Sequence, residues 1–426
     1  MYKYFFIILY FLIFLLILTF ERKIFNSHIS PLTFFCLLWC IVGIGANMAL
    51  YDYYEPSVFI NMIIITSIII VFIFFLIIRK KINFNKLGDM VISFKMNLLF
   101  LIILEILFIL LSIPKFLNAY TIFITYGMDI LRGADVIGVG KDVGIFNILV
   151  EIVVKPGFYC IDLIAILSIF NDFKKKDKIV LWIINIFNII YFTIMTAGRA
   201  FLVNSLFYFI ITVVIFKRKR ILFFLKKEKS KLIVFLGLIF YLLIMQNLRS
   251  PDISLLKTFY TYYFSGPIYM SKLLDLNKSI FMINSDYLYG IATFGFVSSF
   301  VSYFLIFLTG ISQGASYFIS SKLTNYNVQI GAKSFINSMC TSNYIFLLDW
   351  GYIGIIIGPL IISIISYCIY KKAIVRPNLC SMCILIFFIN ILIRTIFKWD
   401  LLYTDICMIY FYLKLFILFS KVRIKW

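Results

Sequence analysis

Long apolar runs recur along the whole sequence and are separated by short polar stretches. Residues 4–20 and 57–78, for example, contain no Asp, Glu, Lys or Arg. A helix of about 20 apolar residues is long enough to cross the hydrocarbon core of a bilayer. The mean hydropathy of +1.04 and the charged fraction of 14% agree with repeated crossings. The sequence therefore predicts an all-α polytopic membrane protein and excludes a cytosolic globular enzyme.

The basic residues predict how these helices are oriented. The chain has 40 Lys and Arg against 19 Asp and Glu, a formal net charge of +21. Many of the basic residues form short runs between apolar segments, which is typical of cytoplasmic loops and not of a nucleic-acid surface. We therefore expect no nucleic-acid partner, an outer N-terminus, an inner C-terminus and about 11 transmembrane helices. The expected spans lie near residues 4–20, 31–50, 57–78, 96–113, 147–170, 179–195, 200–216, 232–248, 344–370, 379–397 and 401–420.

Two connections in this topology are long, and both fall on the outer side. They cover residues 114–146 and 249–343 of what we expect to be a single integral membrane domain, 1–426. Residues 288–310 in the second loop are apolar enough to cross, but a crossing there would move the following basic residues outside. The small and hydroxyl side chains of this segment favour a re-entrant or interfacial helix that packs against protein.

Arginines on the outer side are candidates for binding an anionic ligand, because a guanidinium forms paired hydrogen bonds with phosphate. Arg132 lies in the first outer loop among glycines and charges of both signs, and Arg199 lies in a short turn between two spans. Arg249 opens the second outer loop, and Arg394 lies near the outer end of a span, one turn before Lys398. The alternatives are an ordinary solvated loop for Arg132 and an interfacial side chain that reaches lipid headgroups for Arg199.

The second outer loop becomes aromatic soon after it begins. Lys257 is followed by Tyr262, Tyr263 and Tyr269 among other aromatic residues. Sugar rings pack their C–H faces on aromatic rings while their hydroxyls bond to tyrosine, so this stretch is a candidate glycan-binding surface. An aromatic belt at the level of the headgroups fits the same pattern equally well.

The remaining polar residues limit the chemistry. Glu151 and Lys155 are four residues apart inside an expected span, so they should lie on one helix face and neutralise each other. The only histidine, His28, falls at the cytoplasmic end, and Cys380-x-x-Cys383 has no second pair to complete a zinc site. No nucleotide-binding motif is present in the sequence. We expect no metal and no cofactor, and electrostatic stabilisation of an activated donor's leaving group.

Four segments carry a resemblance to a known family. They are the Gly198-Arg199 turn, residues 263–267 (Tyr-Phe-Ser-Gly-Pro), residues 289–295 (Tyr-Gly-Ile-Ala-Thr-Phe-Gly) and residues 343–354, where Asn-Tyr precedes Asp-Trp-Gly-Tyr-Ile-Gly. In this order, within a chain of many spans, they resemble the O-antigen polymerases, the Wzy-type polymerases of oligosaccharide repeat units.

The resemblance implies a C-type glycosyltransferase architecture in a bacterial inner membrane, with the active face in the periplasm. Members transfer a growing glycan from undecaprenyl diphosphate to a new lipid-linked repeat unit and work with a chain-length regulator. By position, Arg199 and Arg249 would be the catalytic arginines that hold the diphosphate. Arg132, Lys257, Tyr262, Tyr263, Tyr269 and Arg394 would then be the substrate-binding candidates.

Two neighbouring functions remain as alternatives. A flippase moves the same lipid-linked unit without chemistry, and it would be favoured if Glu151, Lys155 and Arg394 lined a passage through the protein. An O-antigen ligase shares the layout but typically places a histidine in the long periplasmic loop, and residues 249–343 contain none.

Overall fold

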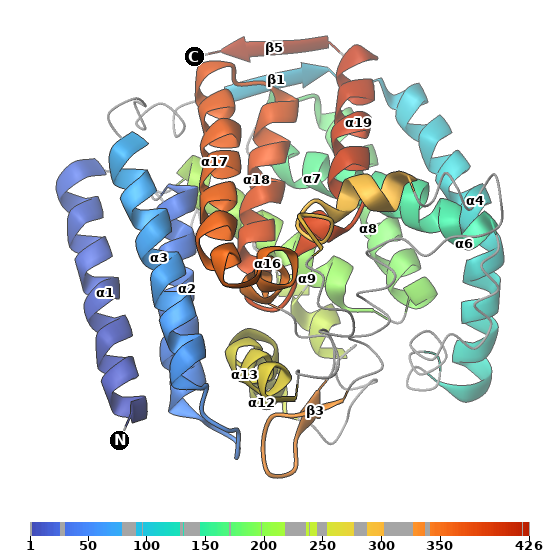
Figure 1. Ribbon diagram of the computed structural model, residues 1–426. Helices are drawn as coiled ribbons and strands as arrows, with labels where there is room; N and C mark the ends of the chain where they lie inside the picture. The colour runs from blue at the N-terminus through green and yellow to red at the C-terminus, as the bar shows by residue number, and fades with distance from the viewer. Residues whose placement is uncertain are drawn as a thin grey trace. The chain divides into compact units, whose positions relative to one another are not determined.

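The computed structural model describes residues 2–25, 30–78, 91–95, 97–127, 131, 145–169, 172–196, 198–217, 236–237, 239–244, 254–276, 288–301, 327–336, 341–419 and 421–425. The chain forms two compact units whose segments alternate along the sequence. Figure 1 shows the helices and strands coloured by their order along the chain. Unit 1 comprises Met1–Asn85, Leu256–Lys371 and Ile391–Thr404. Unit 2 comprises Lys86–Leu255, Lys372–Asn390 and Asp405–Trp426.

Long apolar helices dominate the described residues. Within the described residues, six candidate spans are long and apolar enough to cross a membrane, and two shorter apolar helices accompany them. All eight fall on expected spans, so the chain is a mainly helical membrane protein. The six are α1 (Tyr2–Phe25), α2 (Pro31–Met48), α3 (Val58–Ile78), α4 (Leu98–Tyr126), α8 (Lys175–Thr196) and the pair α16 (Ser342–Trp350) with α17 (Gly354–Val375). The two shorter ones are α9 (Ala200–Lys217) and α18 (Leu379–Arg394).

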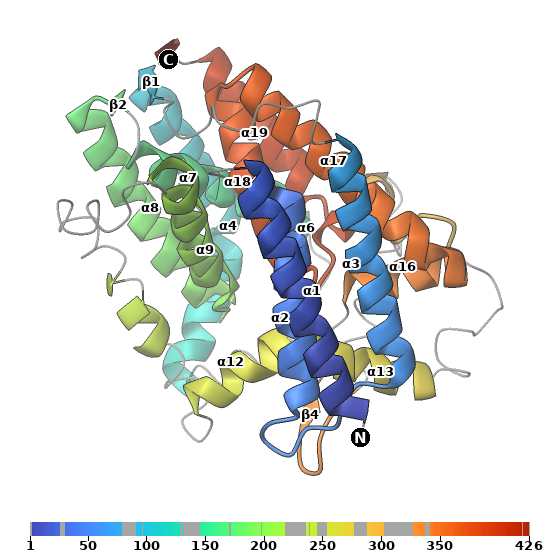
Figure 2. The same ribbon diagram turned by 90° about the vertical axis from the view of Figure 1, so that its left-hand side faces the viewer.

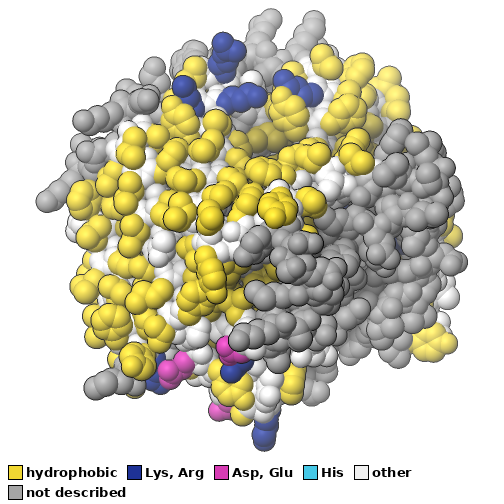
Figure 3. Space-filling model, viewed as in Figure 1, with side chains coloured by type: hydrophobic (Ala, Val, Ile, Leu, Met, Phe, Trp, Pro, Cys, Tyr) yellow, Lys and Arg dark blue, Asp and Glu magenta, His cyan; other side chains and the backbone are white. Residues whose placement is uncertain are grey.

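In unit 1, α1, α2 and α3 pack side by side (Figure 2). Ser30 caps the start of α2 by accepting the Thr33 N–H at 3.0 Å, and Pro31 occupies the first turn, where no N–H is needed. The outward residues of α1, α3 and α17 are apolar and exposed, and Figure 3 shows hydrophobic side chains over this face. A surface of this kind is suited to lipid contact.

The end of α2 and the start of α3 meet part of the expected second outer loop. That part consists of α12 (Leu255–Phe264), α13 (Gly266–Leu276) and a hairpin of β3 (Val328–Gln329) and β4 (Phe335–Ile336). Tyr260 donates to the Gly45 carbonyl at 2.7 Å, and Ser271 accepts the Ser57 N–H at 2.9 Å. The connection between α2 and α3 and the loop segment therefore lie at the same end of unit 1 (Figure 2).

Unit 2 contains a helix that runs through α6 (Ile145–Leu149), the π-helical turn η3 (Val150–Val154) and α7 (Lys155–Ser168). It packs with α8, α9 and α19 (Asp405–Leu418). A small sheet joins distant parts of this unit in the strand order β2 (Asp172–Phe173), β1 (Val91–Lys95), β5 (Lys421–Lys425). β1 and β5 are antiparallel, with Ser93 opposite Arg423. This sheet was not predicted from the sequence.

Two expected boundaries differ in the structure. Residues 114–126, assigned to the first outer loop, continue α4, and Pro114 lies inside the helix. The carbonyl that Pro114 leaves without an N–H partner is that of Leu110, four residues earlier, and membrane helices tolerate such a proline where the rest of the helix is held by its neighbours. The expected span 344–370 is divided at Gly351, whose φ of +57° favours a residue without a side chain. Of the expected re-entrant segment 288–310, residues 295–301 are helical and 302–310 lie outside the described residues.

Candidate functional site

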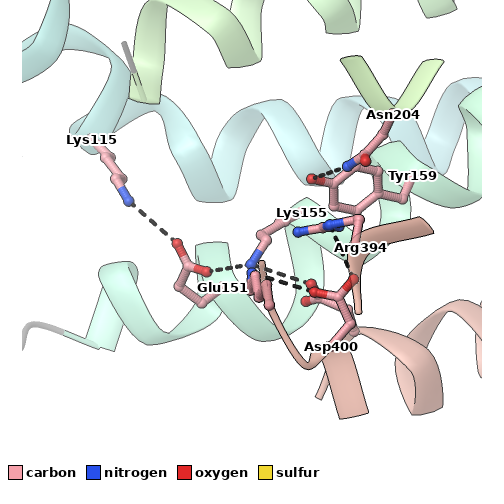
Figure 4. Close-up of polar contacts among 9 residues, drawn as sticks. Lys115, Glu151, Lys155, Tyr159, Asn204, Arg394 and Asp400 are labelled. Atoms are coloured by element: carbon pink, nitrogen blue, oxygen red, sulfur yellow. Dashed lines mark hydrogen bonds and ion pairs between the residues drawn. The ribbon is translucent and has the colours of Figure 1, made fainter. Parts of the chain in front are cut away.

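A charged corner follows the end of α18 in unit 1. The Arg394 Nε lies 3.1 Å from one oxygen of Asp400 (Figure 4). The Lys398 Nζ lies 3.4 Å from the other oxygen. The Arg394 carbonyl accepts the Lys398 N–H at 2.7 Å, which fixes the turn between them. One carboxylate therefore sits between two cations, and the three side chains together carry one positive charge in excess. We call Arg394, Lys398 and Asp400 the Arg394 corner.

A second segment is bound to this corner through a buried carboxylate. Asp349, in the last turn of α16, accepts the N–H of Ala292 at 3.0 Å and that of Thr293 at 2.5 Å. The Thr293 carbonyl in turn accepts the Trp399 indole N–H at 2.8 Å. Trp399 lies between Lys398 and Asp400 in the sequence and is 2% exposed. Residues 289–295 thus hold the backbone of the Arg394 corner in place.

The junction between α12 and α13 contacts the same corner. A Cβ atom on Gly266 would lie 2.1 Å from the Ile396 carbonyl oxygen, so this approach requires glycine. The Tyr263 ring meets Phe397 edge-on, with ring centroids 6.1 Å apart. Burial raises the pKa of the Tyr263 phenol, and the nearby positive charge of Arg394 opposes part of that rise. Three of the four segments that carry the family resemblance therefore meet at the Arg394 corner.

The predicted site residues lie in different surroundings in the structure. Arg394 and Tyr263 come together, while Lys257 and Tyr262 are half-buried on α12. Tyr269 is fully buried on α13, and its N–H donates to the Ser265 carbonyl at 2.8 Å. The half-buried Arg199 lies in unit 2, at the turn between α8 and α9. Arg132 and Arg249 lie outside the described residues.

A second polar cluster lies in unit 2. Lys155 pairs with Glu151 at 3.0 Å, which confirms the expected neutralisation, and also with Asp405 at 3.3 Å (Figure 4). Lys115 on α4 lies 3.7 Å from the other Glu151 oxygen. The cluster surrounds the π-helical turn η3, a feature that often occurs at functional sites. Its two cations and two carboxylates balance, so the cluster attracts an anion less than the Arg394 corner does.

Several residues of these clusters were not predicted from the sequence. Asp400 follows Lys398 by two positions, and this nearness was the signal that could have found it. Asp349 was noticed only as part of a resembling segment, and its partners lie more than 50 residues away, at 292 and 293. Lys115 and Asp405 are brought to Glu151 and Lys155 only by helix packing.

No known family model matches the chain, no curated protein is detectably similar to it, and no solved structure matches its fold.

Proposed function

We propose that the chain is a metal-independent glycosyltransferase that polymerises undecaprenyl-diphosphate-linked O-antigen repeat units on the periplasmic face of a bacterial inner membrane. The supporting observation is the Arg394 corner, where an excess positive charge meets three segments that resemble O-antigen polymerases. The exposed apolar helices support the membrane location.

The chemistry of the corner suits a donor that leaves as a diphosphate. Arg394 and Lys398 would stabilise the negative charge that develops on the diphosphate when the bond from the anomeric carbon to its oxygen breaks. The acceptor hydroxyl oxygen would form the new bond to that carbon, and Asp400, released from the two cations, would accept the hydroxyl proton. By the family resemblance, and independently of the Arg394 corner, Arg199 and Arg249 remain proposed catalytic contacts to a lipid diphosphate. A chain-length regulator remains the proposed protein partner.

The decisive experiment is an electrophoretic separation of lipopolysaccharide from a strain that lacks the gene, with and without the gene restored on a plasmid. We expect the ladder to collapse to core plus one repeat and to return with the wild-type gene. Complete loss of surface repeats would instead indicate a flippase or a ligase. An unchanged ladder would reject a role in this pathway.

Arg394→Gln should reduce long polymer on the restored strain by about 100-fold, because it removes a charge that stabilises the leaving group. Lys371→Gln is the matched control, since Lys371 lies near the end of α17, lies 5.5 Å from the Tyr367 ring centroid and has no place in the proposed chemistry. The ladder measures polymer, and an immunoblot of the membranes measures protein. A normal ladder with Arg394→Gln would reject the role of Arg394.

Arg199→Ala should abolish long polymer while the protein stays in the membrane, because the variant loses a guanidinium proposed to hold the diphosphate. Lys176→Ala, on the exposed first turn of α8, is the control and should leave the ladder unchanged. Wild-type polymer from Arg199→Ala would remove Arg199 from the site without affecting the case for Arg394.

A further inference from the structure

A buried carboxyl group in unit 2 has no part in the proposed transfer reaction. Asp162 on α7 is completely buried between two neighbouring helices. The Asn185 amide on α8 lies 2.9 Å from one carboxyl oxygen, and the Ser205 hydroxyl on α9 lies 2.6 Å from the other. Asn185 and Ser205 are also completely buried. Three side chains from three helices thus form one polar cluster away from solvent.

With Asp162 ionised, the cluster lacks one of the hydrogens needed to form all of its hydrogen bonds. The Ser205 hydroxyl lies within hydrogen-bond distance of both Asp162 and the Phe201 carbonyl, the latter at 3.2 Å, but it has one hydrogen to donate. If Asp162 carries a proton, it donates to Ser205, and Ser205 donates to Phe201. All three contacts then form at once. In addition, the buried Oδ1 of Asn185 finds no donor among the described residues.

No charge in the described part of unit 2 compensates an ionised Asp162. None of the ion pairs among the described residues includes it. On α7 itself, Lys155 is paired with Glu151 and Asp405. An isolated carboxylate in such surroundings is strongly unfavourable and is usually neutralised.

The other groups around this part of α7 are neutral or bonded elsewhere. Tyr159 on α7 bonds to Asn204 of α9, at 3.3 Å, and Asn204 bonds to Asn390 of α18, at 3.0 Å. Tyr412 of α19 donates to the Val153 carbonyl at 3.0 Å. Cys160 on α7 faces Cys380 and Cys383 of α18. Glu105 of α4 bonds to Asn188 of α8, at 3.1 Å, and lies close to Tyr191.

We propose that Asp162, Asn185 and Ser205 form a proton-binding site within the membrane part of unit 2. The proton resides on the Asp162 oxygen that faces Ser205, and its release breaks that O–H bond and leaves a carboxylate to which Ser205 donates instead. The site does not depend on the proposed glycosyltransferase function. Releasing the proton places a negative charge between α7, α8 and α9, so the packing of these helices depends on the proton.

Infrared spectroscopy of the purified protein tests the site directly, because the C=O stretch of a protonated carboxylic acid lies above the amide band and shifts in D₂O. We expect such a band in the wild type and its reduction in Asp162→Asn. Asparagine has the shape of the protonated acid and can make the same contacts, so the variant should fold. Glu105→Gln shows how much the other buried carboxyl group contributes to the band. Asp405→Asn alters an ion-paired carboxylate and should leave the band unchanged.

Thermal unfolding across pH supplies a second measurement. The folded wild type keeps the Asp162 proton at pH values at which the unfolded chain has already released it. The stability of the folded protein should therefore fall as pH rises through that range. Asp162→Asn should lack that part of the fall. An unchanged infrared band in Asp162→Asn would overturn the proposal. A second outcome would also overturn it, in favour of a sodium site. In that outcome the wild type lacks the band and is stabilised by Na⁺ but not by K⁺, and Asp162→Asn loses this stabilisation.

Discussion

Asp349→Ala is expected to destabilise unit 1 by about 3 kcal/mol or more and to leave little folded protein in the membrane. The Asp349 carboxylate is completely buried and accepts two backbone N–H groups, from Ala292 and Thr293. Alanine leaves both donors buried without an acceptor, and a buried unpaired donor costs about 1–3 kcal/mol. Because Thr293 accepts the Trp399 indole N–H, the Arg394 corner should lose its support as well.

The unfolding temperature in detergent and the fraction of protein that migrates as a single species measure this loss. Asp349→Asn should lie between wild type and Asp349→Ala, since its amide oxygen can accept one of the two N–H groups but its NH₂ cannot accept the other. Asp275→Ala is the matched control, because the Asp275 side chain is 68% exposed and its pairing with Lys272 at 4.0 Å is weak. Equal unfolding temperatures for Asp349→Ala and Asp275→Ala would contradict the role of Asp349.

Lys155→Met is expected to destabilise unit 2 by about 2–3 kcal/mol. The Lys155 and Asp405 side chains are 18% and 17% exposed and lie 3.3 Å apart, so methionine leaves a mostly buried carboxylate without its cation. We place the loss below that of a fully buried pair because some solvent reaches both groups. The unfolding temperature of the purified protein again reports the change.

A double variant distinguishes charge from packing in this cluster. Lys155→Met combined with Asp405→Asn should recover part of the lost stability, because no unpaired charge remains at Asp405. Lys115→Met is the control, since Lys115 lies 3.7 Å from Glu151, whose side chain is 42% exposed. If the double variant is less stable than Lys155→Met alone, the cluster contributes through packing and not through its charges.

The positions of the membrane helices could be predicted from the sequence because hydropathy is a local property. Residues 57–78 contain no charged side chain, and α3 runs over Val58–Ile78. Helix ends were less predictable. The expected span 96–113 ends too early, because α4 continues to Tyr126, and the break after α16 depends on the conformation of Gly351. Local composition does not indicate whether a helix continues through a proline or breaks at a glycine, because the surrounding fold decides this.

The pairing of distant residues was beyond the sequence. The basic run at Lys421–Lys425 predicted a cytoplasmic tail, whereas its pairing with Val91–Lys95 depends on packing across most of the chain. The i, i+4 pair of Glu151 and Lys155 was predictable because helix geometry alone brings the two together.

The same distinction applies to the candidate site. Arg394 and Tyr263 were both selected by residue type and position, but their proximity was not predicted. Tyr269 was selected by the same aromatic pattern and is buried in the protein interior, because an aromatic ring satisfies a core position as well as a ligand surface. A single sequence does not separate these two uses.

The alternation of the two units along the chain constrains how the protein can be made. Unit 1 needs residues up to Thr404 and unit 2 needs β5, so neither can be completed while the middle of the chain is still being synthesised. The early helices must wait in the bilayer with part of their packing surface exposed to lipid or to insertion factors. Truncated fragments should therefore be substrates for membrane quality-control proteases, and neither unit can be expressed alone from one continuous gene segment.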